Sequence, residues 1–286
     1  MATGNMKDIK RRIKSVSSTR QITKAMELVA SSKLRKAKQR SENGRAYFEA
    51  MYGLLAEIAA VKKDFKTVFT EEREVKNKLY IVIAGDRGLA GGFNSNILKA
   101  VAAAHKDDPV KPKIIAIGRK AVDYFDKRGY EIVAKYPYFA EKMKTAHCTD
   151  IAQLAGDLFA VGEVDEVRLF YTAFVSPLVQ TPESAKLLPI ANIGTGMGED
   201  LGLINYDPSP EAVFDRVVPK FLMSMISCAV VESFASEQGA RRTAMENATD
   251  NADEMIANLS LVYNRARQEK ITNEITEIVS GANALS

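Results

Sequence analysis

One stretch near the C-terminus has the clearest repeating pattern in the chain: residues 245–266 read MENATDNADEMIANLSLVYNRA. Apolar and small side chains recur there in alternating steps of three and four residues, the spacing of a coiled-coil seam. The seam positions predicted by this spacing are Met245, Ala248, Ala252, Met255, Leu259, Val262 and Ala266. After a shift of frame, the same alternation continues through Ile271, Ile275, Ile278, Ala282 and Leu285. The pattern predicts a long helix that packs against a second one.

The prolines indicate where this C-terminal helix begins. All nine lie between Pro109 and Pro219. A proline inside a helix costs roughly 3 kcal/mol, because it removes a hydrogen bond and clashes with the preceding turn. We therefore expect a helix that starts near Ser209 or Pro210, capped by Asp207 or Ser209, with Pro219 either kinking it or marking its true start. Such a helix is roughly 110 Å long.

The N-terminal segment also contains no proline and has helical spacing over about residues 5–60. Its predicted apolar stripe is Met6, Ile9, Ile13 and Val16 and then, after an irregular step, Ile22, Met26, Val29, Ala30, Leu34 and Ala37. A helix of this length spans roughly 80 Å. The two ends of the chain therefore predict a long antiparallel coiled coil in which the C-terminal helix is the longer and protrudes unpaired.

The middle of the chain alternates short apolar runs with helical segments. The predicted strands are residues 79–84, 113–118, 131–134 and 166–171, with possible edge strands at 178–181 and 185–190. The predicted helices are residues 94–104, begun by Asn94 or Ser95, then 121–128 and 151–159, and a glycine-rich loop is expected at 192–202. This order predicts an open, mostly parallel, Rossmann-like α/β domain inserted between the two coiled-coil helices. The expected division is 1–75, 76–207 and 208–286.

Charge is distributed unevenly along a chain whose formal net charge is only +4. Residues 7–40 contain twelve Lys and Arg and only two acids, whereas residues 211–286 contain eleven acids and seven bases. A basic helix face binds nucleic acid or an anionic surface in some proteins. This run lacks interleaved aromatic residues, so a solvated face with protein partners is the preferred interpretation, and a basic, nucleic-acid-binding coiled-coil protein is the alternative.

Motifs for catalysis or cofactor binding are weak. The glycine-rich segment 85–92 matches neither the phosphate-binding loop of nucleotide hydrolases nor the dinucleotide fingerprint, and a tight strand-to-helix turn explains it. The only histidines are His105 and His147, and the only cysteines are Cys148 and Cys228, which form no cluster at metal-ligand spacing. We expect a non-catalytic chain without metal or cofactor, whose cysteines are ordinary thiols. A small enzyme built on the α/β insert is a further alternative.

The last turns of the chain combine charge and apolar surface. Glu274 and Glu277 are three residues apart on one helix edge, and Ile278 and Val279 make the tip apolar. A protruding apolar helix end is unfavourable in water, so it is expected to enter a socket on another molecule.

These segments resemble one family, the gamma subunits of rotary ATP synthase. The C-terminal pattern I-T-x-E-x-x-E-x-x-x-G-A-x-A at 271–284 carries the resemblance, together with IKRRIKSV at 9–16, TRQITKAMELVASSK at 19–33, GDRGLAGGFN at 85–94 and ATDNA at 248–252. The similarity extends over essentially the whole chain.

The resemblance implies a central rotating shaft that couples proton flow through a membrane sector to ATP synthesis or hydrolysis in a ring of alternating alpha and beta subunits. The nucleotide sites belong to that ring. It also implies contacts with the epsilon subunit and the membrane c-ring, no nucleic acid, and a place at the cytoplasmic face of a bacterial cell membrane. By the same resemblance, the residues expected to contact the ring are Lys24, Met26, Arg267, Gln268, Thr272, Glu274 and Glu277.

Overall fold

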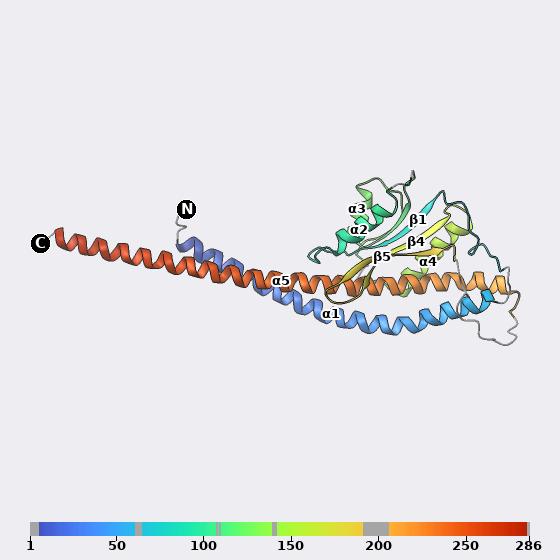
Figure 1. The fold of residues 1–286 in the computed structure, drawn as a ribbon, viewed down its shortest axis with the longest axis horizontal. Helices are drawn as coiled ribbons and strands as arrows, with labels where there is room; N and C mark the ends of the chain where they lie inside the picture. Colours follow the sequence, from blue (N-terminus) through green and yellow to red (C-terminus); the bar gives the residue numbers. More distant parts are fainter. Residues whose placement is uncertain are drawn as a thin grey trace. The chain divides into compact units, whose positions relative to one another are not determined.

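The computed structural model describes residues 6–60, 65–106, 108, 110–138, 142–190 and 206–284 (Figure 1). Two long helices, α1 (Met6–Ala60) and α5 (Pro210–Ala284), come first and last in the chain. The elements between them are β1 (Lys78–Ile83), α2 (Phe93–Ala104), β2 (Lys113–Ile117), α3 (Arg119–Asp126), β3 (Ile132–Tyr136), α4 (Thr145–Ala160), β4 (Glu166–Phe174) and β5 (Gln180–Leu188). This arrangement confirms the predicted class, two long terminal helices with an inserted α/β sheet.

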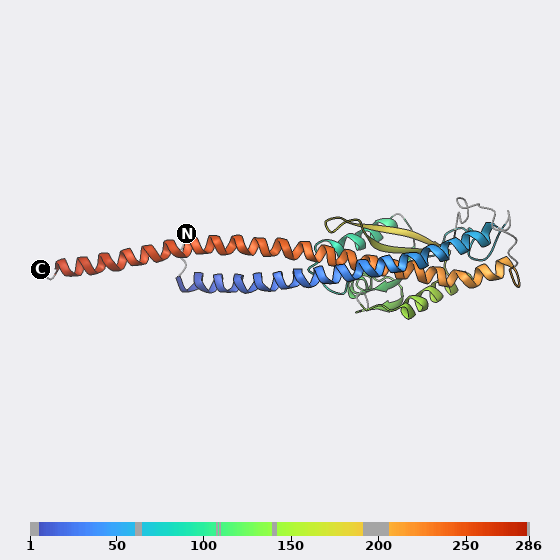
Figure 2. The ribbon, with the colours of Figure 1, turned by 90° about the horizontal axis from the view of Figure 1, so that it is seen from below.

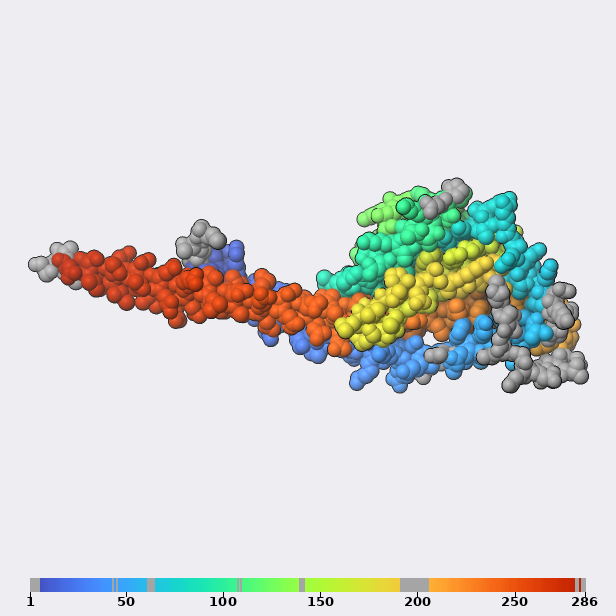
Figure 3. All heavy atoms as spheres, in the orientation of Figure 1, coloured from blue at the N-terminus to red at the C-terminus, as the bar shows by residue number. Residues whose placement is uncertain are grey.

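The chain forms two compact units, and both long helices contribute to each. The helical unit consists of Met1–Ala30 and Arg242–Ser286, and the sheet unit is Ser31–Arg241. Within the helical unit, α1 and α5 run side by side in opposite directions (Figure 2), and the end of α5 continues past the start of α1 (Figure 3). The units do not follow the divisions at 75/76 and 207/208, because the inner halves of both helices share the core of the sheet. Those divisions remain a prediction about folding domains.

The sheet has the strand order β3-β2-β1-β4-β5. Its first four strands are parallel, and β5 pairs with β4 in the antiparallel sense. The prediction of two separate edge strands at 178–181 and 185–190 is wrong, because one continuous strand, β5, overlaps both ranges. Pro182 lies inside β5. An edge strand tolerates proline where the backbone nitrogen faces outward, because no further strand there would accept a hydrogen bond from it.

The sheet is covered on both faces, and alternate strand residues enter two separate cores. Tyr80 and Val82 of β1 pack with α2 and α3 on one face. Leu79 and Ile81 pack on the other face with α4 and with the inner halves of α1 and α5. Burial on both sides explains why these strands read as continuous apolar runs rather than as alternating ones.

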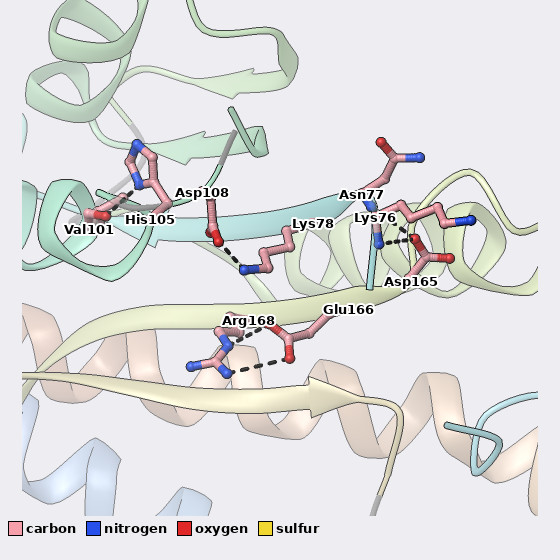
Figure 4. Close-up of polar contacts among 9 residues, drawn as sticks. All are labelled: Lys76, Asn77, Lys78, Val101, His105, Asp108, Asp165, Glu166 and Arg168. Atoms are coloured by element: carbon pink, nitrogen blue, oxygen red, sulfur yellow. Dashed lines mark hydrogen bonds and ion pairs between the residues drawn. The ribbon is translucent and has the colours of Figure 1, made fainter. Parts of the chain in front are cut away.

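Polar contacts hold β1 and β4 together at their amino ends (Figure 4). Oδ2 of Asp165 accepts hydrogen bonds from the backbone N–H groups of Lys76 and Asn77, at 2.9 and 2.8 Å. Nearby, Nζ of Lys78 lies 2.7 Å from Oδ2 of Asp108. These contacts satisfy polar groups where the two neighbouring strands begin. Because β1 and β4 are parallel, their carboxyl ends lie together at the opposite end of the strands.

Helix α5 begins as predicted, with Ser209 as its cap: the N–H of Ala212 donates to the Ser209 hydroxyl at 3.2 Å. The helix continues through Pro219, so Pro219 is not its start. The most apolar 18-residue window of α5 has a mean hydropathy of 1.5, enough by length and composition to cross a membrane. Its residues from Phe214 to Val230 contribute to the core against the sheet, and a core helix meets the same criterion.

The partly buried carboxylate of Asp215 on α5 is expected to make the stability of the fold depend on pH. Burial raises the pKa of Asp215, a hydrogen bond from Thr67 partly offsets this, and the charge of Glu211 adds to it. Oδ1 of Asp215 has no hydrogen-bond partner among the described residues. Because the native pKa is the higher one, protonation stabilises the fold below the unfolded pKa of about 3.9, and this contribution is lost as pH rises through the native pKa.

Asp215→Asn is therefore expected to raise the melting temperature at pH 7 by a few degrees and to have little effect at about pH 4. Thermal unfolding followed by circular dichroism at the two pH values measures the difference. Asp250→Asn, which changes an exposed acid on the same helix, is the matched control and should leave the melting temperature unchanged. Equal effects of Asp215→Asn at both pH values would contradict the expected pH dependence.

Candidate partner-contact surfaces

The seam of the helical unit lies on α5 at Met245, Thr249, Ala252, Ile256, Leu259, Tyr263 and Ala266, all of them buried or half-buried. The sequence pattern predicted four of these positions correctly. It was wrong at Ala248, which is half-buried next to the seam residue Thr249, and at Met255 and Val262, whose side chains are 52% and 53% exposed. The steps still alternate between three and four residues, but in the opposite order. The face of α5 that enters the seam is therefore turned slightly about the helix axis from the predicted face.

A buried polar pair explains this rotation. The hydroxyl oxygens of Thr23 on α1 and Thr249 on α5 are 2.8 Å apart, and both side chains are buried. One turn away, Arg20 forms an ion pair with Asp253 across the same two helices. Polar residues at seam positions fix the register of a coiled coil, because any shift leaves them unpaired. Sequence reasoning missed these four residues because it searched for apolar side chains only.

The same error affected α1. Its seam runs without interruption from Met6, Ile9, Ile13 and Val16 through Arg20, Thr23, Glu27 and Ala30 to Leu34 and Ala37. The irregular step predicted after Val16 is therefore wrong, and Ile22 and Val29 are exposed. Extending the three–four alternation from Val16 with polar residues allowed would have found the correct positions.

Two predicted contact residues, Lys24 and Met26, lie on α1 beside this seam. Lys24 is exposed, and its Nζ is 3.1 Å from Oε2 of Glu27, whose side chain is buried. Met26 is half-buried. Lys24 belongs to a basic face, because eleven of the twelve basic residues between 7 and 40 are exposed and Lys33 is half-buried. This face suits an acidic partner surface.

The other five predicted contact residues lie where α5 extends past its seam. The side chains of residues 267–280 are all exposed, and this group includes Arg267, Gln268, Thr272, Glu274 and Glu277. Nζ of Lys270 is 3.5 Å from Oε1 of Glu274, a surface pair that contributes little stability. On the face shown in Figure 3, no other element covers this end of the helix. The structure thus groups these five residues on one helix end and places Lys24 and Met26 on the other helix.

An apolar stripe accompanies those charges. Ile271, Ile275 and Ile278 follow each other at steps of four and three residues, and Ile278 is 71% exposed. Val279 beside them is also exposed. Large apolar side chains gathered on one exposed helix end favour contact with another protein. The predicted stripe positions Ala282 and Leu285 lie outside the residues whose side chains the structure describes.

The glycine-rich segment 85–92 is a turn of the sheet unit between β1 and α2, as predicted. Neither Asn94 nor Ser95 begins the helix, because α2 starts at Phe93 after Gly92. Asn94 closes the turn instead: its Oδ1 accepts from the N–H of Gly85 at 2.8 Å, and its Nδ2 donates to the carbonyl of Arg87 at 3.0 Å. Hydrogen bonds of Asn94 to Gly85 and Arg87 therefore stabilise the turn.

Comparisons with known proteins agree with this architecture. Residues 5–285 match the family model described as ATP synthase. The ATP synthase gamma chain of Ruminococcus albus is 51% identical over 97% of this chain and 98% of its own length. The sodium-ion-specific ATP synthase gamma chain of Acetobacterium woodii is 43% identical over 99% of both chains. These matches give no support to the nucleic-acid alternative.

Solved structures show the same fold. A chain of the Euglena gracilis mitochondrial ATP synthase matches with a TM-score of 0.70 at 18% identity, over 99% of this chain and 95% of that one. A chain of the Tetrahymena thermophila mitochondrial ATP synthase central stalk and c-ring matches with a TM-score of 0.64 at 23% identity, over 79% and 99%. By its sequence and its fold, the chain belongs to the ATP synthase gamma chain family, the central stalk subunits of rotary ATP synthase.

Proposed function

We propose that this chain is the central rotating shaft of an ATP synthase and couples proton flow through the membrane sector to ATP synthesis or hydrolysis. The observation that carries the proposal is the end of α5, where charged residues and an apolar stripe project past the paired region of the two helices. Such an end is suited to a socket formed by other subunits. The shaft itself is a non-catalytic component, and the catalytic nucleotide sites lie in the ring around it.

The two helices of the shaft carry different surfaces, and the proposed function depends on this asymmetry. Lys24 and the exposed basic face of α1 lie on one helix, whereas Glu274, Glu277 and the apolar stripe lie on the other. Each subunit of a surrounding ring therefore meets a different surface and is stabilised in a different conformation. Rotation exchanges those surfaces, and the coupling between shaft angle and nucleotide affinity is reciprocal. Either ion flow or ATP hydrolysis then drives the other.

The proposed partners follow from this role. Three alpha and three beta subunits surround the coiled coil, while the sheet unit contacts the epsilon subunit and the membrane c-ring. Association with the membrane is peripheral, through the complex and at the cytoplasmic face. Within the ring, Arg267, Gln268, Thr272, Glu274 and Glu277 contact one level, and Lys24 and Met26 contact another.

Reconstitution tests the proposal directly. The purified chain is mixed with alpha and beta subunits of Ruminococcus albus, whose gamma chain is 51% identical, and the size and ATPase activity of the complex are measured. One copy of the chain per ring, with steady ATP hydrolysis that requires it, is the expected result. A folded chain that neither enters the ring nor changes its ATPase activity would overturn the proposal.

A charge placed at Met26 is expected to weaken coupling. Met26→Lys adds a cation to a half-buried position beside the seam, next to the exposed Lys24, and so changes the surface offered to the ring. We expect fewer protons pumped per ATP hydrolysed, measured in vesicles containing the whole complex. Met26→Leu keeps an apolar side chain of similar volume and should pump like the parent. Equal pumping ratios for Met26→Lys and the parent would contradict the assignment.

A further inference from the structure

Residues 232–241 of α5 lie outside the carboxyl ends of β1 and β4, in the space that is called the crevice here. The order β3-β2-β1-β4-β5 reverses direction at β1, and α4 packs on the opposite face from α2 and α3. In open α/β sheets, ligands bind outside the carboxyl ends of the strands at such a reversal. Here that place is bounded by the glycine-rich turn after β1 and by the carboxyl end of β4.

The carboxyl end of β4 has backbone groups that no neighbouring strand pairs with. Pairing with β1 ends at Phe170, but β4 continues to Phe174. On the other side, Thr172 is opposite Pro182 of β5. The N–H and C=O of Thr172 bond to α5 and not to β5, so they lie on the side where β1 has already ended. Buried backbone groups without partners are costly, so this strand end needs hydrogen bonds from elsewhere.

Side chains of α5 supply those hydrogen bonds. The N–H of Thr172 donates to the hydroxyl of Ser233 at 3.0 Å, and the hydroxyl of Ser236 donates to the carbonyl of Thr172 at 3.0 Å. The N–H of Phe174 donates to Oε1 of Glu232 at 3.1 Å. One helix face thus does for β4 what a neighbouring strand would do. Burial raises the pKa of Glu232, and the Phe174 N–H partly offsets that rise.

The same stretch of α5 also holds the turn on the other side of the crevice. Nη2 of Arg241 donates to the carbonyl of Gly88 at 3.2 Å and to Oε1 of Glu237 at 2.7 Å. A Cβ on Gly85 would lie 3.0 Å from the Glu237 carboxyl group, so the turn and the helix are in close contact. Five side chains of α5 between residues 232 and 241 therefore touch both walls of the crevice.

Small residues allow this close approach. A Cβ on Gly239 would lie 3.3 Å from the Phe174 ring, which shows how near the helix runs to the end of β4. Helix α1 meets the same ring, with Nζ of Lys38 at 4.8 Å from its centroid. Leu34 and Ala37 of α1 and Ala235 of α5 form a small apolar cluster against Phe174. The strand end is thus held by both long helices.

We propose that residues 232–241 of α5 act as an internal ligand of this crevice and that Glu232, Ser233 and Ser236 are positioning residues that fix α5 to β4 within the sheet unit for the transmission of torque. The hydrophobic effect depends on the area buried and is non-directional. Hydrogen bonds to two separate residues of one strand define both the axial position and the rotation of the helix. The part of this proposal that concerns torque rests on the proposed shaft function.

Hydrogen exchange in the full chain tests the contact itself. Ser233→Ala combined with Ser236→Ala is expected to speed exchange of the Thr172 amide roughly tenfold, with little change at β1 or β2. Ser224→Ala is the matched control, because Ser224 is a buried serine of the same helix whose hydroxyl donates to the carbonyl of Phe221 within the helix. Unchanged exchange at Thr172, or equal acceleration throughout the sheet, would overturn the contact.

The role in torque is tested in the assembled complex by comparing ATP-driven proton pumping with ATP hydrolysis. Adding Glu232→Leu to the double serine variant is expected to lower the number of protons pumped per ATP while ATP hydrolysis continues. Adding Glu232→Gln instead keeps an acceptor oxygen at this position, so this variant should pump more protons per ATP than the Glu232→Leu variant. Local acceleration of exchange with unchanged pumping would overturn the torque role. If the parent chain itself supports no coupled pumping, the shaft function fails, and the exchange result still decides the contact.

Discussion

Replacement of Gly118 by alanine is expected to prevent a large fraction of the protein molecules from folding. Gly118 joins β2 to α3 with φ of +89° and ψ of 143°, a backbone region open essentially to glycine alone. A Cβ at this position would lie 2.0 Å from the carbonyl oxygen of Ala84, which follows β1. That contact is backbone, so no side-chain rotation relieves it, and the ends of two central strands would have to separate.

The expected cost exceeds about 4 kcal/mol, and much of the Gly118→Ala chain should appear in the insoluble fraction. Gly129→Ala is the matched control, since Gly129 also has positive φ, +65°, but a Cβ there would meet no atom of the described residues within 4 Å. That control should cost only about 1–2 kcal/mol. Soluble expression and thermal unfolding of the two variants give the comparison. Similar melting temperatures would show that the strand ends move apart more easily than the geometry indicates.

Removal of the Glu237 carboxylate is expected to have the second largest effect on stability. Glu237 and Arg241 form an ion pair on α5 whose side chains are only 6% and 11% exposed. Removing one partner of a buried pair leaves an uncompensated charge and costs roughly 3–5 kcal/mol. For Glu237→Met we therefore expect the melting temperature to fall by about 10 °C. The same change should also loosen the glycine-rich turn, because Arg241 donates to the carbonyl of Gly88.

The double variant Glu237→Met with Arg241→Met separates charge from packing. Replacing both members of a buried pair by apolar residues of similar volume is often close to neutral, so the double variant should recover most of the lost stability. Glu237→Gln, which keeps an acceptor oxygen, should fall between the parent and Glu237→Met. A double variant that is less stable than Glu237→Met alone would contradict the interpretation, and would indicate that the Arg241 bond to the turn matters more than the ion pair.

Much of the architecture was predictable because it depends on local chemistry. The absence of proline from the first 108 residues and after Pro219 permits two long helices, and the three–four alternation of apolar residues requires that they pair. The alternation of apolar runs with helical segments predicts a parallel sheet. The contact residues came from the family resemblance, and the structure places five of the seven, from Arg267 to Glu277, on an exposed end of α5; their contacts with a ring stay a prediction.

Long-range contacts decided what the sequence left open. Which face of α5 enters the seam depends on Thr249 meeting Thr23, and these residues are 226 positions apart. A helical pattern records which residues share a face, but a buried polar residue is recognised only once its partner is known. The length of β5 and the place of Pro182 depend in the same way on the register with β4.

Residue spacing and composition therefore predicted the long helices and the α/β sheet, because both act within a few turns of chain, and the family was identified by the resemblance of its motifs. The role of Glu232, Ser233 and Ser236 in completing the end of β4 follows only from the folded arrangement, since the backbone groups they satisfy lose their strand partner where β1 ends. The hydrogen-bonding needs of a strand are set by its neighbours in space, and no periodicity along α5 records them.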